Sequence, residues 1–172
     1  QTIAWFDSND ILYKSDGFPG FFADVPSGVY YGFPSIDGTG LKIGRYDNGD
    51  PIDPAYYNKS FGSYDKDESD ISGFLNRYMQ QANGNVNVGK TCMFTNTLDE
   101  HFVIDKHPEH EHIVIAAGFS GHGYKFSSAV GEILYELTTK GKSKQDISLF
   151  KITRPSLQPE NKEKVFNKAR GG

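Results

Sequence analysis

The hydrophobic positions of the chain form their most distinctive pattern in the second half. Residues 113–117 (IVIAA) make a continuous apolar run, which is typical of a short strand that is buried on both faces. Three glycines follow at Gly118, Gly121 and Gly123, and apolar residues then recur at helical spacing between Val130 and Leu137. The order of strand, glycine-rich loop and helix predicts that bare backbone and a positive helix end approach a ligand, which we expect to be anionic or electron-rich.

In the first half, short segments of alternating apolar and polar residues predict an antiparallel meander. Strands are expected at residues 2–6, 21–25, 29–33 and 41–46. The segment Pro26-Ser27-Gly28 is predicted to join the second and third strands as a hairpin. Residues 47–65 are rich in Asp, Asn, Pro and Tyr, so we expect them to be mostly loop.

The clearest helix pattern follows this loop. One face of the predicted helix carries five apolar residues at the spacing i, i+3, i+4, i+7 and i+8, namely Ile71, Phe74, Leu75, Tyr78 and Met79. We expect this helix to end at Asn83-Gly84. Strands are then predicted at residues 86–97 and 102–105, and the second helix is expected to close at Gly141. The polar residues 159–172 are predicted to be a surface tail.

Together these elements predict an α+β fold, in which a mostly antiparallel sheet with one crossing helix is followed by a strand, a glycine loop and a helix. A chain of 172 residues can bury a core of its own. The net charge of −4 and the lack of a long Lys/Arg block predict no nucleic-acid partner. No apolar run approaches membrane-spanning length, so no membrane partner is expected. The single cysteine excludes an internal disulfide and favours a reducing compartment, the cytoplasm.

Several residues carry candidate chemistry, and each also has a purely structural interpretation. Lys42 would serve as a proton or charge donor if it pointed inward, but strand alternation favours a side chain in water. Cys92 is interpreted as a small buried hydrophobe, because a lone cysteine is more often that than a nucleophile. His107, His110 and His112 are interpreted as a surface turn, since no partner ligand pattern accompanies them.

The glycine loop itself has two interpretations that the residues leave open. Its spacing differs from the dinucleotide-binding fingerprint, and no acidic residue follows a second strand about 20 residues on, as that motif needs. It is either a ligand-binding segment near a helix start or an ordinary tight connection between a strand and a helix.

Longer segments carry a family resemblance. Residues 92–134 (CMFTNTLDEHFVIDKHPEHEHIVIAAGFSGHGYKFSSAVGEIL) closely resemble the C-terminal half of the FAD-dependent amine oxidases of the monomeric sarcosine oxidase and N-methyltryptophan oxidase family. The segments PSGVYYGFPS (residues 26–35) and GLKIG (residues 40–44) match in the same order, and the resemblance extends to about Pro155. It implies the C-terminal portion of a flavoprotein oxidase that oxidises a secondary N-methyl amino acid such as sarcosine and reduces O2 to H2O2.

The resemblance also implies roles for individual residues. Cys92 would carry FAD covalently through a thioether to the 8α-methyl group of the flavin, and Lys42 would activate O2. Lys125 would pair with the carboxylate of the amino acid substrate, and His122 and Tyr31 would line the same site. The loop residues Phe119, Ser120, Gly121 and Gly123 would lie beside the flavin, where the following helix start would stabilise negative charge.

Two positions depart from the family pattern, and one large part of the family is absent. Phe94 and Tyr46 stand where the relatives carry a tyrosine and a histidine, which leaves the preferred amine open. The dinucleotide-binding unit with which the family begins has no counterpart in this sequence, so we expect an N-terminal FAD-binding half as partner and little activity from this fragment alone. Residues 1–88 are predicted to belong to the substrate-binding domain and residues 89–172 to the FAD-binding domain. A non-catalytic ligand-binding or interaction domain on the same scaffold is the alternative.

Overall fold

The computed structural model describes residues 1–56 and 60–158 of the chain. The chain divides into two compact units, Gln1–Met93 and Phe94–Gly172, and each is described below by itself. Both combine helices with antiparallel strands, so the α+β class predicted from the sequence is confirmed. The predicted tail at residues 159–172 lies outside the described residues.

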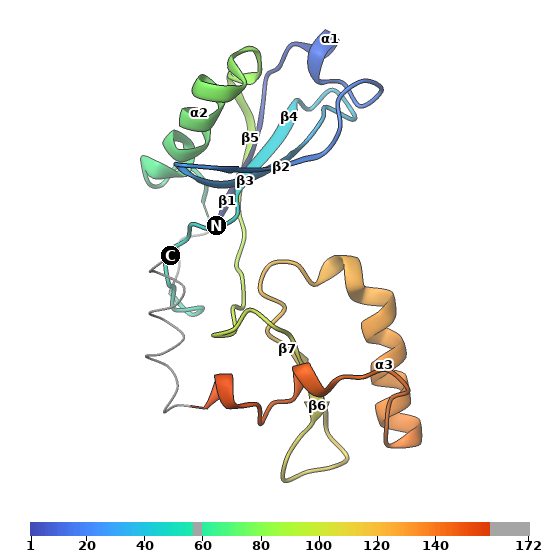
Figure 1. Cartoon of the computed structure of the whole chain (residues 1–172). Coiled ribbons are helices and arrows are strands. Elements are labelled where there is room, and N and C mark those ends of the chain that lie inside the picture. Colours follow the sequence, from blue (N-terminus) through green and yellow to red (C-terminus); the bar gives the residue numbers. More distant parts are fainter. Residues whose placement is uncertain (57–59, 159–172) are drawn as a thin grey trace. The chain divides into compact units, whose positions relative to one another are not determined.

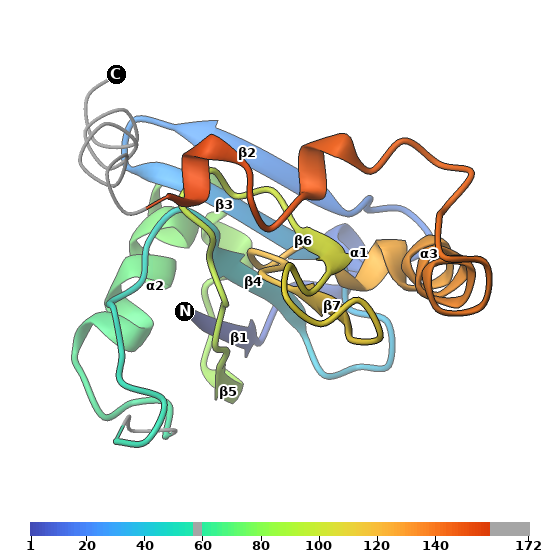
Figure 2. The ribbon, with the colours of Figure 1, turned by 90° about the horizontal axis from the view of Figure 1, so that it is seen from below.

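The first unit is built on a five-stranded sheet whose neighbouring strands are all antiparallel. The strands, in chain order, are β1 (Thr2–Phe6), β2 (Phe21–Val25), β3 (Gly28–Phe33), β4 (Leu41–Arg45) and β5 (Val86–Thr91). Their order in the sheet is β2-β3-β4-β1-β5, which can be followed from one edge to the other in Figure 2. The meander β2-β3-β4 and the hairpin between β2 and β3 agree with the prediction, and β1 lies between β4 and β5.

One face of this sheet is covered by the helix α2 (Lys66–Tyr78) (Figure 1). Ile71, Phe74 and Leu75 of the predicted apolar face are buried there, because α2 presents them at helical spacing. They pack against alternate residues of the strands, including Ala4, Phe6, Tyr30, Leu41 and Ile43. A short helix, α1 (Asp10–Tyr13), adds Tyr13 to this core.

The opposite face of the sheet carries a set of aromatic residues and a lysine, which we call the second face: Trp5, Phe22, Tyr31, Phe33 and Lys42. Lys42 lies directly opposite Trp5 on one side and Phe33 on the other, and Phe22 lies opposite Tyr31. Residues that are opposite each other in antiparallel strands share a face, and so do residues two apart along one strand. All five side chains therefore project away from α2.

The second unit contains a two-stranded antiparallel sheet, β6 (Val103–Lys106) and β7 (Val114–Ala117), with the helix α3 (Ser127–Lys140) (Figure 1). Its core consists of Phe102, Ile104, Val130, Ile133 and Leu137. The helix ends at Gly141 as predicted, since this glycine adopts a φ of 76°. The expectation that residues 113–117 are buried on both faces is wrong, because within residues 1–56 and 60–158 β7 pairs only with β6, and its residues are half-buried or exposed.

Two predicted boundaries also need correction. The strand predicted at residues 86–97 ends at Thr91, the residue paired with Thr2 at the start of β1. The helix α2 ends at Tyr78, five residues before the predicted stop, because Met79 leaves the helical conformation with φ −142° and ψ 55°, and a 3-10 turn follows at Gln80–Ala82. None of the helices in the described part of the chain has the length and apolar character that a membrane crossing needs.

Candidate functional site

Lys42 occupies the centre of the second face. Its Nζ lies 5.1 Å from the centroid of the Trp5 ring and 5.6 Å from that of the Phe33 ring, both within the range of cation–π attraction. The side chain projects away from the core, as strand alternation predicts. It is nevertheless half-buried between two rings rather than free in water. The sheet thus holds one positive charge among aromatic side chains.

Tyr31 lies on the same face and extends across β4. It is directly opposite Gly44, whose missing side chain leaves room for the phenol ring. Burial, and after it the negative charge of a Cys92 thiolate, raise the pKa of the Tyr31 hydroxyl above its usual value. The hydroxyl therefore keeps its proton at neutral pH and is available as a hydrogen-bond donor.

Cys92 is a free, half-buried cysteine one residue beyond β5. Its backbone N–H donates to Gln1 O at 2.7 Å, and the amino group of Gln1 donates to Cys92 O at 3.1 Å. These two bonds continue the β1–β5 ladder past the Thr2–Thr91 pair. By alternation from Lys90, which is paired with Ile3, Cys92 projects from the second face. Tyr31, Lys42 and Cys92 are thus brought together on one side of the first unit.

The glycine loop of the second unit is folded tightly onto the segment that precedes β6. Ser120 is only 3% exposed and adopts a φ of 47°, which is uncommon for a residue with a side chain. Its N–H donates to Thr95 O at 3.2 Å and its Oγ accepts from Thr97 N at 3.2 Å. A Cβ on Gly121 would lie 2.4 Å from the Phe94 ring, so this ring fits only against glycine. The loop is therefore closely packed and hydrogen-bonded in a defined conformation.

The other predicted residues of this loop differ in their surroundings. His122 Nδ1 lies 2.9 Å from Ser120 O, and its ring lies 5.0 Å from the ring of the buried Phe102. Phe119 packs against Phe102 as well, at 4.9 Å. Lys125 is exposed on a 3-10 turn (Tyr124–Phe126) that precedes α3, with its Nζ 5.5 Å from the Phe126 ring. His122 is thus held in place by its neighbours, whereas the charge of Lys125 faces solvent.

Gly123 completes this part of the prediction, because a Cβ there would lie 2.6 Å from Phe119. The loop residues form one group in the second unit, and Tyr31, Lys42 and Cys92 form another in the first. That the two groups line a single site stays a prediction.

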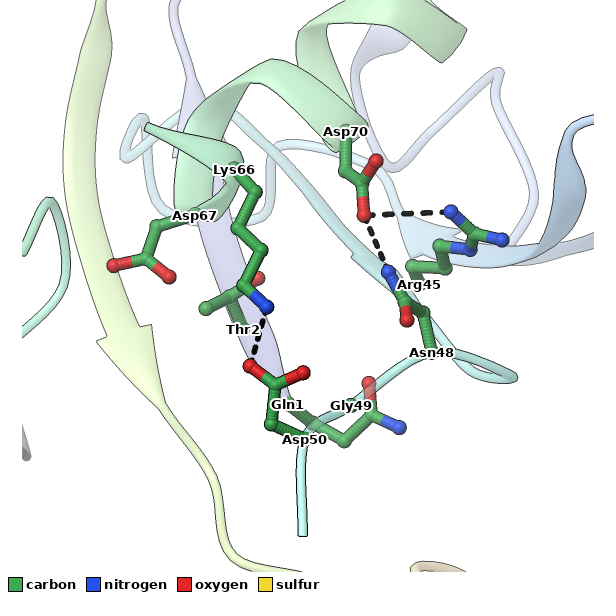
Figure 3. Close-up of a pocket in the computed structure, with 9 residues that line it drawn as sticks. All are labelled: Gln1, Thr2, Arg45, Asn48, Gly49, Asp50, Lys66, Asp67 and Asp70. Atoms are coloured by element: carbon green, nitrogen blue, oxygen red, sulfur yellow. Dashed lines mark hydrogen bonds and ion pairs between the residues drawn. The ribbon is translucent and has the colours of Figure 1, made fainter. Parts of the chain in front are cut away.

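A small polar pocket of about 60 Å³ lies at the start of α2 (Figure 3), and none of the predicted site residues lines it. Each of its charged side chains has a partner in the protein, and Asp67 Oδ2 accepts from the N–H groups of Gly62 and Tyr64 at 3.0 and 3.2 Å. Asp70 Oδ2 accepts from Arg45 Nη1 at 3.3 Å and from Asn48 Nδ2 at 2.6 Å, and Lys66 is ion-paired with Asp50 (Figure 3). These contacts tie the loop after β4 to α2, which is a structural role.

The histidines of the segment HPEHEH lie near one another on the surface of the second unit. The ring centroids of His107 and His110 are 4.9 Å apart, and those of His110 and His112 are 6.0 Å apart. Over residues 1–56 and 60–158, no group of three or more His, Cys, Asp or Glu side chains has an arrangement that could hold a metal ion.

Sequence reasoning missed the aromatic neighbours of Lys42. Trp5 and Phe33 were assigned only to strands, although both are cross-strand partners of the lysine. Alternation along β1 predicts that Trp5 lies on the face opposite to Ala4 and Phe6. No local pattern in the sequence predicts that β1 pairs with β4, so the contact of Trp5 with Lys42 could not be found.

Solved structures of oxidoreductases share this fold. L-proline dehydrogenase from P. horikoshii matches with a TM-score of 0.70 and 22% sequence identity, over 99% of this chain and 39% of that one. Fructosyl amine: oxygen oxidoreductase (Amadoriase I) from Aspergillus fumigatus matches with a TM-score of 0.70 and 20% identity, over 95% of this chain and 38% of that one. These similarities establish the fold.

The chain belongs to the FAD dependent oxidoreductase family, which matches residues 6–137. It is 54% identical to monomeric sarcosine oxidase of Bacillus sp. (strain B-0618), over 92% of this chain and 41% of that protein. It is 32% identical to N-methyl-L-tryptophan oxidase of Yersinia pestis (strain Pestoides F), over 90% of this chain and 41% of that protein. The resemblance inferred from the motifs is confirmed, and the chain spans about two fifths of the length of these curated relatives.

Proposed function

We propose that this chain is the C-terminal part of an FAD-dependent oxidase that acts on a secondary N-methyl amino acid such as sarcosine. The reaction would convert sarcosine, O2 and water to glycine, formaldehyde and H2O2. The observation that carries the proposal is the common placement of Tyr31, Lys42 and Cys92 on the sheet face opposite α2. The identity of 54% to a monomeric sarcosine oxidase supports the substrate class.

The residues of the second face fit a flat, electron-accepting ring. Trp5, Tyr31 and Phe33 offer half-exposed aromatic surface, and Lys42 offers a positive charge. Cys92 offers a free thiol at the margin of the same face, where it would hold the flavin by a thioether bond. When bound, FAD would supply the chemistry of the reaction by accepting two electrons from the amine and passing them to O2.

The chain's own residues would then bind the substrate and stabilise charge. The Tyr31 hydroxyl, which keeps its proton, would donate a hydrogen bond within the substrate pocket. The Lys42 ammonium would stabilise the negative charge that develops on oxygen as it is reduced. Lys125 would attract the substrate carboxylate, with His122 beside it in the loop.

The loop of the second unit would support the flavin through backbone contacts. The segment from Phe119 to Gly123, which includes Ser120 and Gly121, is hydrogen-bonded and closely packed in the structure, and a segment already held in one conformation would orient a cofactor with little further loss of entropy. The remaining three fifths of the relatives' length would supply the dinucleotide-binding part of the FAD site. The single half-buried thiol of Cys92 fits the reducing conditions of the cytoplasm, where we place the protein.

The proposal is tested by acid precipitation of the protein expressed from its complete gene. We expect yellow flavin absorbance to stay with the precipitate of the wild type and of M93L, a control next to the attachment site. The precipitate of C92A should be colourless. If wild-type precipitate is also colourless, Cys92 does not hold the flavin. If in addition sarcosine and N-methyltryptophan yield no H2O2, a non-catalytic ligand-binding domain replaces the oxidase.

A further inference from the structure

Two lysine side chains share the ring of Trp5. The Nζ of Lys42 lies 5.1 Å from the ring centroid, and the Nζ of Lys90 lies 5.6 Å from it. The two lysines reach the indole from the two strands that flank β1, since Lys42 lies on β4 and Lys90 on β5. Lys90 is paired with Ile3, two residues from Trp5 on the same face, so its side chain extends diagonally over the ring.

Neither ammonium group has an acidic partner among the described residues. In the part of the chain that the structure describes, no carboxylate lies within ion-pairing distance of Lys42 or Lys90. This contrasts with Lys66, Lys140 and Lys144, each of which has a carboxylate partner, in a chain of net charge −4. Lys42 and Lys90 therefore bring two positive charges to the Trp5 ring, and among the described residues no carboxylate is paired with either of them.

An indole ring can fix an ammonium group without cancelling its charge. A carboxylate would also orient a lysine, but the pair would be neutral and would attract anions weakly. The face of an indole attracts a cation through its quadrupole and leaves the full charge available to a third group. This property matters when a site has to stabilise negative charge on another molecule.

We propose that Trp5 is a positioning residue for Lys42 and Lys90, and that Lys90 is a second cation for the oxygen step. This inference rests on the proposed function. In that step the reduced flavin loses two electrons and two protons, and O2 gains them to become H2O2. Negative charge is present on oxygen after the first electron has moved and before the protons arrive, and both ammonium groups stabilise it there.

The geometry is tested without any flavin chemistry. Lysines of the complete protein are reductively methylated with 13C-formaldehyde, which keeps their positive charge, and their N-methyl resonances are assigned with K42R and K90R. Methyl groups over an aromatic ring are shifted upfield by its ring current. In the wild type we expect the N-methyl resonances of Lys42 and Lys90 to lie upfield of those of the other lysines. In W5L we expect them to move to the chemical shifts of the other lysines. Resonances of Lys42 and Lys90 that coincide with those of the other lysines in the wild type would overturn the proposal.

The role in the reaction is tested by separating the two half-reactions in a stopped-flow instrument. We expect W5L and K90M to lower the rate constant for reoxidation by O2 about two- to fivefold, as cation–π energies at exposed sites imply. Flavin reduction by sarcosine under anaerobic conditions should be unchanged. K66M removes the same charge at the first residue of α2, on the opposite side of the sheet, and should change neither rate.

The possible outcomes separate this proposal from the proposed function. Upfield resonances together with slower reoxidation in W5L and K90M support the proposal. Upfield resonances with an unchanged reoxidation rate reduce Trp5 to a structural residue and overturn its role in the oxygen step. If sarcosine does not reduce the flavin, the proposed function fails, and chemical reduction with dithionite still allows reoxidation to be compared among the variants.

Discussion

The hydroxyl oxygen of Tyr31 lies 2.9 Å from the position that a β-carbon on Gly44 would occupy. The same β-carbon would lie 2.7 Å from Cγ2 of Ile3, so it would have no room on either side. Gly44 is paired with both Tyr31 and Ile3 in the sheet, and its hydrogen in place of a side chain lets the phenol ring cross β4. The direction in which the Tyr31 hydroxyl points is thus set by a residue on another strand.

Substitution of Gly44 by alanine should displace Tyr31. We expect G44A to lower the free energy of unfolding by about 1–3 kcal/mol, because an added methyl group in a filled site forces its neighbours to move. In the complete enzyme the KM for sarcosine should rise, since the hydroxyl would leave its position in the proposed pocket. Urea denaturation and steady-state kinetics measure the two effects.

A matched control is available in α2. A Cβ on Gly73 would meet no atom within 4 Å, so G73A adds the same methyl group without a clash. Because glycine is unfavourable inside a helix, G73A should instead stabilise the protein, by about 0.5–1 kcal/mol. Equal effects of G44A and G73A would show that the contact between Tyr31 and Gly44 is not sterically tight.

The sequence predicted most elements of the first unit but not the way in which they assemble. Alternation identified the strands, and helical spacing identified the buried face of α2 with Ile71, Phe74 and Leu75. The insertion of β1 between β4 and β5 depends on contacts between residues more than 35 positions apart, such as Trp5 with Lys42, which no local pattern encodes. The grouping of Tyr31, Lys42 and Cys92 on one face follows only once this pairing is known.

In the second unit the local patterns predicted the helix and the loop, but they predicted too much burial for β7. A continuous apolar run indicates burial on both faces, and residues 113–117 have such a run. Within the described residues, β7 is covered by α3 on one side and pairs only with β6. The family resemblance supplied the residue roles, because the types and spacing of Lys42 and Cys92 favoured structural interpretations.

The raised pKa of Tyr31 should be measurable as late ionisation. The absorbance at 295 nm of the wild type minus that of Y31F isolates this tyrosine during an alkaline titration. We expect a midpoint above the usual value of 10.0, because burial disfavours the phenolate. Removing the charge of Cys92 by C92S should bring the midpoint part of the way back, and a midpoint that C92S leaves unchanged would place the thiolate too far from Tyr31.

Arg154 connects the segment that precedes β6 with the segment that follows α3. The guanidinium, in a residue that is 8% exposed, donates from Nε and Nη2 to the two carboxylate oxygens of Asp99 at 2.7 and 2.8 Å, and from Nη1 to Phe102 O at 2.9 Å. We expect R154M to lower the free energy of unfolding by about 3 kcal/mol, because it leaves Asp99 partly buried without its partner. R77M, which removes an exposed arginine from the end of α2, should lower the free energy of unfolding by less than about 0.5 kcal/mol.

The ion pair of Asp99 and Arg154 also makes the free energy of unfolding depend on pH. Hydrogen bonds from Arg154 hold the pKa of Asp99 well below its ordinary value of 3.8. A carboxylate with a lowered pKa in the folded state stabilises the protein above its unfolded pKa, and this contribution is lost as the pH falls below about 4. D99N should therefore be less stable than the wild type at pH 7, and the difference should shrink on acidification. A difference that stays constant from pH 7 to pH 2 would contradict this origin.

Glu136 provides a second acid-sensitive contact, at the end of α3. Its Oε2 accepts from the N–H of Lys144 at 3.0 Å and from Ser143 Oγ at 3.0 Å, and its Oε1 accepts from Lys140 Nζ at 3.1 Å. The hydrogen bond from the Lys144 backbone is the main cause that lowers the pKa of Glu136 from 4.5 to about 2. The carboxylate thus ties the turn after the helix back onto its last turns.

Since the pKa of Glu136 is lower in the folded state, the unfolded chain binds about one more proton than the folded protein between pH 2 and pH 4.5. The stabilisation is complete above pH 4.5 and disappears as the pH approaches 2. In E136Q, urea midpoints measured across this window should fall less steeply with decreasing pH than in the wild type. E132Q alters an exposed glutamate on the same helix, whose partner Lys144 is also exposed, and should keep the wild-type slope. If E132Q flattened the slope as much as E136Q, the acid sensitivity would belong to the net charge of the helix and not to the buried carboxylate.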